Sequence, residues 1–349
     1  MTLTESIPIW LDCDTGNDDT FAILLAALHQ KFNLVGISTV YGNAPLPYTT
    51  HNTLAILDVL GFKQDDIKVY SGSSKPFEIP PRYATSIHGP TGIEGATLPK
   101  HPTIEESKDQ TYLEAIKEAV LQYKGRLNIV STGALTNVAK LFQTYPGLRS
   151  EVNFLAIMGG GIELGNITKF AEFNVHCDPH AAQLVLGDPV LKDKTVLVPL
   201  NVTNRAIAKK SIHDQIYIKN NARKNSNARK VFYDIISFYG IAYNLNRDGF
   251  GEGPPIHDPL TIFVLMALLN KLGNHHDDEA GDFGLKYVRG DVDVVIDGEH
   301  EGQTVLSKRN DTGTYVTVDI DYGIFWSYIL EALDNSDLRN GASEDSIVN

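Results

Sequence analysis

The feature that most constrains this chain is the stretch WLDCDTGNDD at residues 10–19, which places four aspartates within eight positions, directly after an apolar run. Carboxylates a few ångströms apart repel one another, and burying even one unpaired carboxylate costs several kcal/mol. A fold that brings them together therefore needs something positive among them. The four residues are Asp12, Asp14, Asp18 and Asp19.

The apolar run at residues 7–11 predicts a strand that ends at these aspartates. Side chains alternate along a strand with period two, so Asp12 and Asp14 are expected to point to the same side. Gly16 permits a tight turn, and the last two aspartates then open the next helix, where carboxylates also serve as caps. Capping explains only two of the four. Because hard cations prefer clustered carboxylate and carbonyl oxygens, the stretch predicts an oxygen-only site for Ca²⁺ or Mg²⁺.

The order of elements predicts an α/β fold. Short β-branched runs alternate with longer helical patterns, which favours a mostly parallel central sheet flanked by helices on both faces. Such sheets bind their ligands at the carboxyl ends of the strands. The expected strands are residues 7–11, 33–41, 67–71, 127–131, 153–158 and 195–199, and the expected helices between them are residues 19–30, 50–60, 112–123, 135–145 and 179–186.

The second part of the chain predicts additions to that core. No internal repeat or low-complexity linker divides the chain, so we expect one domain over residues 1–334 with a polar tail at residues 335–349. A stretch rich in Gly, Pro and Thr at residues 82–100 is expected to be a long functional loop. The additions are helices at residues 209–220, 228–244 and 259–272, a small β section at residues 292–296, 303–308 and 315–319, and a final helix at residues 322–333.

Composition narrows the classes of partner. The 30 Lys and Arg against 43 Asp and Glu give a net charge of −13, which disfavours nucleic acid and anionic membrane surfaces. The longest apolar stretches fall short of a bilayer span. Two cysteines without a paired framework, and an N-terminus without a signal-peptide pattern, indicate a reducing compartment. We therefore expect a cytoplasmic protein, with the nucleus as an open alternative.

Three further groups of polar side chains lie where a predicted strand ends or a helix begins. One group follows the glycines at residues 159–161, and its carboxylate and amide side chains match sugar hydroxyls, which both donate and accept hydrogen bonds. Each group also has a plainer interpretation, as a turn, a polar surface loop or a helix cap. The residues are Asn43 after the second strand, Asn166, Glu172 and Asn174 in the loop, and His257 with Asp258 before an apolar helix.

Two other sequence motifs partly match the aspartate-rich stretch at residues 10–19. An EF-hand loop counted from Asp12 needs Gly at its sixth position and Glu at its twelfth, but Asn17 and Ile23 stand there, so that interpretation fails. The tetrapeptide DCDT at residues 12–15 also resembles the DxDxT signature of haloacid-dehalogenase-like phosphatases, which need a later acidic pair at a strand end. The clearest late acidic run, at residues 277–279, has no predicted strand before it. The phosphatase stays as an alternative.

Together these segments resemble the inosine–uridine-preferring nucleoside hydrolases, and among them the fungal uridine ribohydrolases. The motifs occur in the family's order over residues 7–263: DCDTGNDD, VYGN, IHGPTGIEG, STGALTN, MGGG with GN and AEFN, and HDP. Thr15 and Ala134 stand where the family usually has Pro, without removing a functional side chain. The resemblance implies the nucleoside hydrolase fold with its Rossmann-like core, and hydrolysis of ribonucleosides to free base and ribose.

The same resemblance implies a metal site and a catalytic pair. Asp14, Asp19 and Asp258 are expected to ligate Ca²⁺ through their carboxylates, and the backbone carbonyl of Thr132 completes the protein ligands. Asp14 is also the expected general base for direct attack of a metal-bound water on the anomeric carbon, which predicts inversion. Surrounding carboxylates stabilise the oxocarbenium-like transition state. His257 is expected to titrate near neutral pH and to give the departing base a proton.

The remaining motif residues are expected to bind the substrate. Uridine in nucleoside salvage is the expected substrate, with cytidine, inosine and nicotinamide riboside left open, and the family implies a homodimer or homotetramer. A ribose- or nucleoside-binding protein without catalysis is the alternative from another class. Asp12 is expected to support the cluster, and the roles of the tyrosines at 239 and 243 stay open. The expected contacts are Asp18, Asn166, Glu172 and Asn174 on the ribose, Asn43 nearby, and His88 with His257 facing the base.

Overall fold

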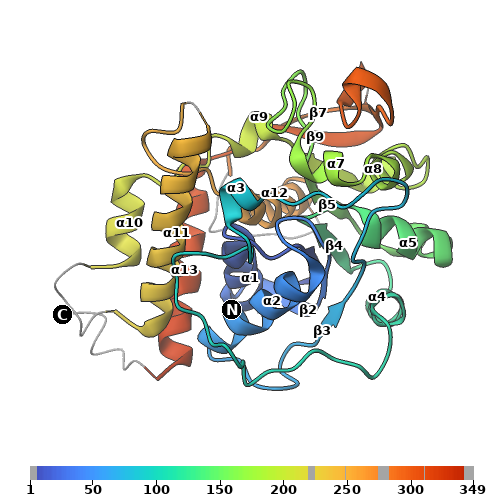
Figure 1. Cartoon of the computed structure of the whole chain (residues 1–349). Helices are drawn as coiled ribbons and strands as arrows, with labels where there is room; N and C mark the ends of the chain where they lie inside the picture. The colour runs from blue at the N-terminus through green and yellow to red at the C-terminus, as the bar shows by residue number, and fades with distance from the viewer. Residues whose placement is uncertain (1–5, 219–224, 248, 274–282, 310, 342–349) are drawn as a thin grey trace.

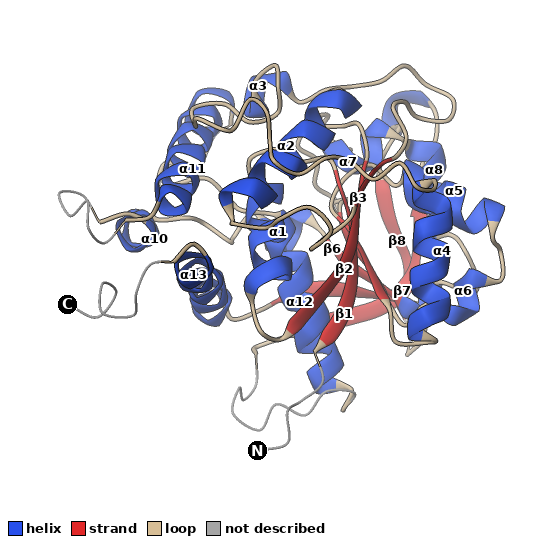
Figure 2. Ribbon diagram, turned by 90° about the horizontal axis from the view of Figure 1, so that it is seen from below, coloured by secondary structure: helices blue, strands red, loops and turns tan. Residues whose placement is uncertain are grey.

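The computed structural model describes residues 6–218, 225–247, 249–273, 283–309 and 311–341, which form one nine-stranded sheet with helices on both faces (Figures 1 and 2). The strand order is β3-β2-β1-β4-β5-β6-β9-β7-β8. The strands are β1 (Ile7–Cys13), β2 (Phe32–Thr39), β3 (Val69–Ser71), β4 (Asn128–Ser131), β5 (Leu155–Met158), β6 (Thr195–Val198), β7 (Lys286–Val294), β8 (Thr304–Arg309) and β9 (Thr314–Asp319).

The helices connect most of these strands and cover both faces of the sheet. In chain order they are α1 (Asp19–Leu28), α2 (Leu46–Val59), α3 (Thr85–His88), α4 (Tyr112–Tyr123), α5 (Thr136–Thr144), α6 (Leu148–Glu151), α7 (Phe173–Cys177), α8 (Pro179–Leu186), α9 (Leu200–Thr203), α10 (Lys210–Ile216), α11 (Asn227–Asn246), α12 (Asp258–Lys271) and α13 (Tyr322–Arg339).

The pairing of the strands confirms the predicted fold class. Every neighbouring pair from β3 through to β9 is parallel, whereas β7 pairs antiparallel with both β9 and β8. Because β9 also pairs with β6, the predicted C-terminal β section is the antiparallel end of the main sheet.

β1 shows how the sheet is held between two hydrophobic cores. Ile9 and Leu11 face the core formed with α1, α2, α12 and α13, whereas Trp10 faces the core formed with α4, α5 and α8. Figure 2 shows these two groups of helices on opposite sides of the strands. The division follows from the period-two alternation of strand side chains, and both faces are apolar because a parallel sheet is covered on both sides.

The carboxyl ends of β1, β2, β4 and β5 meet at one edge of the sheet. Thr132 follows β4 directly, and its N–H donates to the carbonyl oxygen of Asp12 at 2.8 Å, which aligns the ends of β4 and β1. The segment after β5 begins with Gly159, and α12 starts at the same edge with Asp258. The fold thus brings together the strand ends that carry the sequence motifs.

Some element boundaries differ from the predicted ones. α2 begins at Leu46, four residues early, and β7 begins at Lys286, six residues early. α13 continues to Arg339, so the first residues of the expected polar tail are helical. Asp337 explains this extension, because it is buried on α13 and paired with a buried arginine on α11. Residues 342–349 lie outside the described part of the chain.

Short helices were not expected, because four or five residues carry too little periodicity to distinguish them from loops. They are α3, α6, α7 and α9. The helix expected over residues 209–220 ends at Ile216, and residues 219–220, like the acidic run at 277–279, are outside the described ranges. None of the described helices is both long and apolar enough to cross a membrane.

Candidate active site

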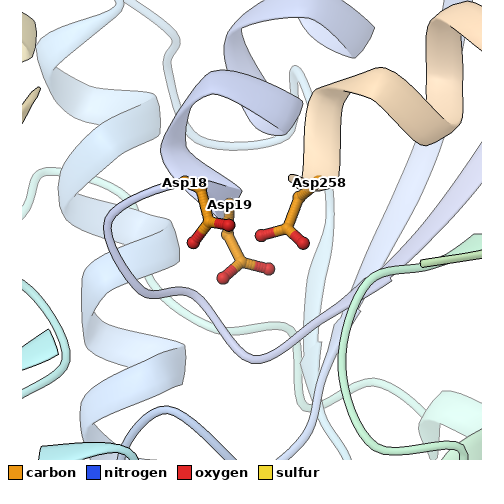
Figure 3. A group of neighbouring side chains, drawn as sticks. All are labelled: Asp18, Asp19 and Asp258. Carbon is orange, nitrogen blue, oxygen red and sulfur yellow. The ribbon is translucent and has the colours of Figure 1, made fainter. Parts of the chain in front are cut away.

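Three aspartates from two helices meet at the carboxyl edge of the sheet. Asp18 and Asp19 come from the start of α1, Asp258 comes from the start of α12, and their carboxylates converge (Figure 3). Ligand oxygens of the three lie within 4.8 Å of one another. Capping does not account for them, because neither Asp18 nor the N-cap residue of α12, His257, makes a side-chain cap hydrogen bond.

Asp14 lies next to this group and is connected to it through Asn43. The backbone N–H of Asn43 donates to Asp14 Oδ2 at 2.7 Å, and its side-chain Nδ2 donates to Asp19 Oδ2 at 3.0 Å. Asp14 Oδ1 is buried and has no hydrogen-bond partner. We call Asp14, Asp18, Asp19 and Asp258 the acidic cluster.

Two glycines of the sequence motifs make room for the Asp14 carboxylate. A Cβ on Gly42 would lie 2.0 Å from Asp14 Oδ2, and a Cβ on Gly133 would lie 2.8 Å from Asp14 Oδ1. Real Cβ atoms do not approach oxygen this closely, so any side chain at either position must displace the carboxylate. VYGN and STGALTN therefore need glycine to accommodate Asp14.

The acidic cluster is buried without a basic partner. Among the described residues, none of its four carboxylates forms a salt bridge. Burial, followed by repulsion from Asp19, raises the pKa of Asp18 to about 7 and raises that of Asp14 well above its usual range. Burial, followed by repulsion from Asp18 and Asp19, also raises the pKa of Asp258 well above its usual range. A buried set of oxygen donors that repel one another fits a divalent metal ion, which would offset the charge.

Asp12 lies apart from the cluster. Its Oδ1 accepts hydrogen bonds from Ser38 Oγ at 2.5 Å and from Asn137 Nδ2 at 2.8 Å. Burial raises its pKa to about 7. Asp12 therefore ties β1 to β2 and α5, and it does not line the pocket described next.

A pocket that is open to solvent lies over the acidic cluster. Concave sites of this kind, with a few converging polar groups, are where small ligands bind. Nine of the residues expected at the site line the pocket. Asp14 and Asp19 lie beneath them, where Asp14 accepts a hydrogen bond from Asn43 and Asp19 accepts one from Thr132. The nine are Asp18, Asn43, His88, Thr132, Asn166, Glu172, Asn174, His257 and Asp258.

One wall of the pocket comes from the loop that leads into α7. Glu172 caps α7 and accepts hydrogen bonds from the N–H groups of Gly160, Asn174 and Val175, which fixes its carboxylate. Asn174 Nδ2 donates to the carbonyl oxygen of Thr132 at 2.7 Å. These bonds hold a carboxylate and an amide side by side at the pocket, an arrangement that suits sugar hydroxyls.

The opposite wall holds His88 and His257. The N–H of Asn17 donates to His88 Nδ1 at 3.1 Å, which places the His88 proton on Nε2. His257 lies between two hydroxyls, with Nε2 2.7 Å from the Tyr243 Oη and Nδ1 2.8 Å from the Thr203 Oγ1. Burial lowers the pKa of both histidines to about 3. The expectation that His257 titrates near neutral pH is therefore wrong in this structure, since desolvation opposes its charged form.

Three residues on α11 and just past its end line the same wall and had no assigned role. They are Tyr239, Tyr243 and Arg247, spaced by four residues, so they share one face of the helix. The ring of Tyr239 lies 5.3 Å from that of His88. The four-residue spacing of these three side chains can be read from the sequence. Only the packing of α11 against α3 shows that this face of the helix lines the pocket.

The structure thus has an α/β fold with a pocket that lies over buried carboxylates at the carboxyl ends of its strands. The chain matches the family model described as "Inosine-uridine preferring nucleoside hydrolase" over residues 9–327. It is 42% identical to the uridine nucleosidase of Saccharomyces cerevisiae, over 97% of this chain and 98% of that one. The chain belongs to the inosine-uridine preferring nucleoside hydrolase family, and it is a nucleoside hydrolase. The resemblance found from the motifs is confirmed, in place of the phosphatase or binding-protein alternatives.

Other relatives differ in the bases that their names give. The pyrimidine-specific ribonucleoside hydrolase RihA of Shewanella woodyi is 33% identical over 94% of this chain and 98% of its own. The purine-preferring ribonucleoside hydrolase of Gardnerella vaginalis has a solved structure that superposes with a TM-score of 0.80 and 26% identity, over 95% of this chain and 99% of that one. The shared fold supports ribonucleoside hydrolysis, and the names of these relatives cover both pyrimidine and purine bases.

Proposed function

We propose that this nucleoside hydrolase prefers uridine, uses Ca²⁺ at the acidic cluster, and releases uracil and ribose in nucleoside salvage. The observation that carries the proposal is the buried Asp14 Oδ1, which has no hydrogen-bond partner and lies beside three other carboxylates. Ca²⁺ takes about six to eight oxygen ligands in flexible geometry, which suits this donor set. Uridine is supported by the name of the yeast relative.

Four residues would hold the ion. These are Asp14, Asp19 and Asp258 through carboxylate oxygens, and Thr132 through its carbonyl oxygen. Asn174 donates to one lone pair of that carbonyl oxygen, and the second lone pair remains available for the ion. When bound, Ca²⁺ supplies positive charge that offsets the carboxylates and lowers the pKa of water. Asp18 converges with Asp19 and Asp258 in the structure, and we propose that it serves the ribose hydroxyls at the pocket floor.

Asp14 would act as the general base. It would take a proton from the water that attacks the anomeric carbon, a role that needs a carboxylate under the pocket with a free oxygen. Asn166, Glu172 and Asn174 would orient the ribose, because their side chains line the wall beside this position. The carboxylates around the sugar stabilise the positive charge that develops on it.

The departing base would lie against the opposite wall. Tyr243 and His257 form a hydrogen-bonded pair there, and Thr203 fixes the other ring nitrogen of His257. We propose that this pair delivers the proton that the base finally needs, with the imidazole acting as a neutral donor. His88 faces the base through its Nε2–H.

The test measures ribose release from uridine by the purified full chain, after a chelator and again after Ca²⁺ is restored. Asp14→Asn is compared with Asp109→Asn, a surface aspartate paired with Lys68. We expect release that needs Ca²⁺, survives in the surface variant and is lost in Asp14→Asn. Release unaffected by the chelator contradicts the metal assignment, and faster release from cytidine, inosine or nicotinamide riboside contradicts the uridine assignment. The cytoplasmic location and the homo-oligomeric state stay predictions.

A further inference from the structure

The pocket wall formed by α11 ends in a positive charge. Arg247 is the only lysine or arginine among the pocket-lining residues of the described chain, and it lies one helical turn beyond Tyr243. An arginine keeps its charge at any pH at which proteins fold. In a pocket rich in carboxylates, this residue requires an explanation of its own.

Arg247 is held in place from one side. Its Nη1 donates to the carbonyl oxygen of Asn166, in the loop across the pocket. No other acceptor for its guanidinium, and no salt bridge, is found among the described residues. A guanidinium has five N–H donors, so most of them stay available to a ligand. The bond to Asn166 therefore orients the group without satisfying it.

The position of the acidic cluster decides which end of a nucleoside meets Arg247. The anomeric carbon must lie near Asp14, because the attacking water loses its proton there. The base then extends away from the acidic cluster and along the face that carries Tyr239, Tyr243 and Arg247. The guanidinium is thus beside the base.

We propose that Arg247 stabilises the negative charge that develops on the departing base, and so favours bases that leave as anions. This inference rests on the proposed hydrolysis of uridine. Water oxygen forms the new bond to the anomeric carbon, and its proton passes to Asp14. The bond from that carbon to uracil N1 breaks, its electron pair moves to uracil and spreads over N1, O2 and O4, and uracil is protonated afterwards. Fixed positive charge near such an anion lowers the barrier to its departure.

The same charge selects among substrates. Uracil presents carbonyl oxygens that accept from a guanidinium. Nicotinamide riboside carries a positive ring and releases a neutral base, so Arg247 repels its ground state and bond breaking only removes that repulsion, which leaves kcat/KM for this substrate without a gain from the charge. The charge therefore favours nucleosides whose base leaves as an anion over those whose base leaves neutral.

Arg247 also bridges two segments, and the experiment must separate that role from charge stabilisation. We suggest comparing uridine with 5-fluorouridine in single turnovers of the full chain with Ca²⁺, in the wild type, Arg247→Gln and Arg247→Lys. Fluorine is almost as small as hydrogen and withdraws electrons, so it stabilises the uracil anion without changing the fit. Arg205→Gln, at an exposed arginine outside the pocket, is the matched control.

We expect Arg247→Gln to slow cleavage of uridine about 100-fold, and to slow cleavage of 5-fluorouridine by a clearly smaller factor. Arg247→Lys keeps the charge and should recover part of the uridine rate. Equal slowing of both substrates would overturn the inference, because loss of the bridge to Asn166 affects both alike. If the wild type released no ribose from either substrate, the proposed function itself would fail, which is a different result.

Discussion

The acidic cluster and the region between α11 and α13 both bury aspartates, and their charges are compensated in opposite ways. Between α11 and α13, Asp337 accepts from Arg229 Nε at 2.5 Å, and the same guanidinium pairs with Asp334. At the carboxyl edge of the sheet, the acidic cluster is buried among amide, hydroxyl and backbone donors, and none of its members has a basic partner among the described residues.

The difference separates a structural pair from a functional site. The α11–α13 pair carries its own cation, so it holds the two helices together under any conditions that keep the chain folded. The acidic cluster depends on a cation from solution, because four buried like charges repel one another. A site that leaves its charges unpaired loses stability and gains a place for a ligand.

The largest effect is expected when the proposed general base, Asp14, is removed from the acidic cluster. Asp14→Ala should lower turnover of uridine about 1,000-fold or more, since a positioned general base contributes about 10²–10⁴-fold. Ribose release in a single turnover measures it, and bound Ca²⁺ is measured in the same sample. Turnover close to wild type with the ion still bound would exclude Asp14 as the base.

Substitutions in the pair between α11 and α13 should lower the free energy of unfolding and leave turnover unchanged. Arg229→Met leaves Asp337 buried without its partner and should cost about 3 kcal/mol of the free energy of unfolding, measured with urea. Lys230→Met removes the neighbouring exposed pair with Asp234 and should cost less than about 1 kcal/mol. Turnover per folded molecule should not change in either variant. Equal costs for the two would show that burial does not distinguish the pairs.

Removal of the metal should affect only the acidic cluster. With Ca²⁺ at about 100 times its dissociation constant, the ion should add about 2.7 kcal/mol to the free energy of unfolding of the wild type, and a chelator should remove this. Arg229→Met should keep the full response, whereas Asp258→Asn should lose most of it. A response that survives in Asp258→Asn would place the ion elsewhere.

The pH dependence of stability should become weaker when the metal is bound. The pKa values of Asp12 and Asp18 are raised to about 7 in the fold, so the folded chain binds more protons than the unfolded chain between about pH 4 and 7. In the presence of a chelator the free energy of unfolding should therefore fall as pH rises through this window, by at least about 1 kcal/mol. With Ca²⁺ the carboxylates of the acidic cluster are charged, so only the smaller fall due to Asp12, which lies outside the cluster, should remain. Thermal melts at a series of pH values check both.

The smallest effect is expected at Asp12. In Asp12→Asn the amide oxygen still accepts from Ser38 and Asn137, and the residue does not line the pocket. Turnover of uridine should fall by less than about tenfold. A loss as large as that of Asp14→Ala would place Asp12 in the catalytic machinery and extend the acidic cluster to it.

The fold was largely predictable because its strands are short apolar runs between long helical patterns. The helices at residues 112–123 and 179–186 have the predicted boundaries, since charged or turn residues flank them. β7 was placed too late, because its first five residues include Lys286, Arg289 and Gly290 and so do not form an apolar run. The end of α13 depended on the pairing of Asp337 with Arg229, which sequence periodicity does not reveal.

The site was predictable where motifs follow strand ends. Parallel strands bring their carboxyl ends together, so Asp14 and Asn43 were expected to meet, and the family resemblance added Thr132. The pocket wall formed by α11 was not predictable from the sequence, because Tyr243 and Arg247 have no motif around them and reach the pocket only through helix packing. The neutral state of His257 was also missed, since it depends on burial and on two hydroxyls from distant segments.

The position of Asp258 has a consequence for how the protein is made. β1 and α1 leave the ribosome early with three of the cluster's aspartates, but Asp258 and the pocket wall beside it follow more than two hundred residues later. Until α12 docks on α1, the early aspartates lack a carboxylate that completes the set. Ca²⁺ should therefore bind the finished fold and not the nascent chain, so a chain truncated before α12 should leave the ion in solution. Metal binding would then report that the chain has formed a contact between segments more than two hundred residues apart.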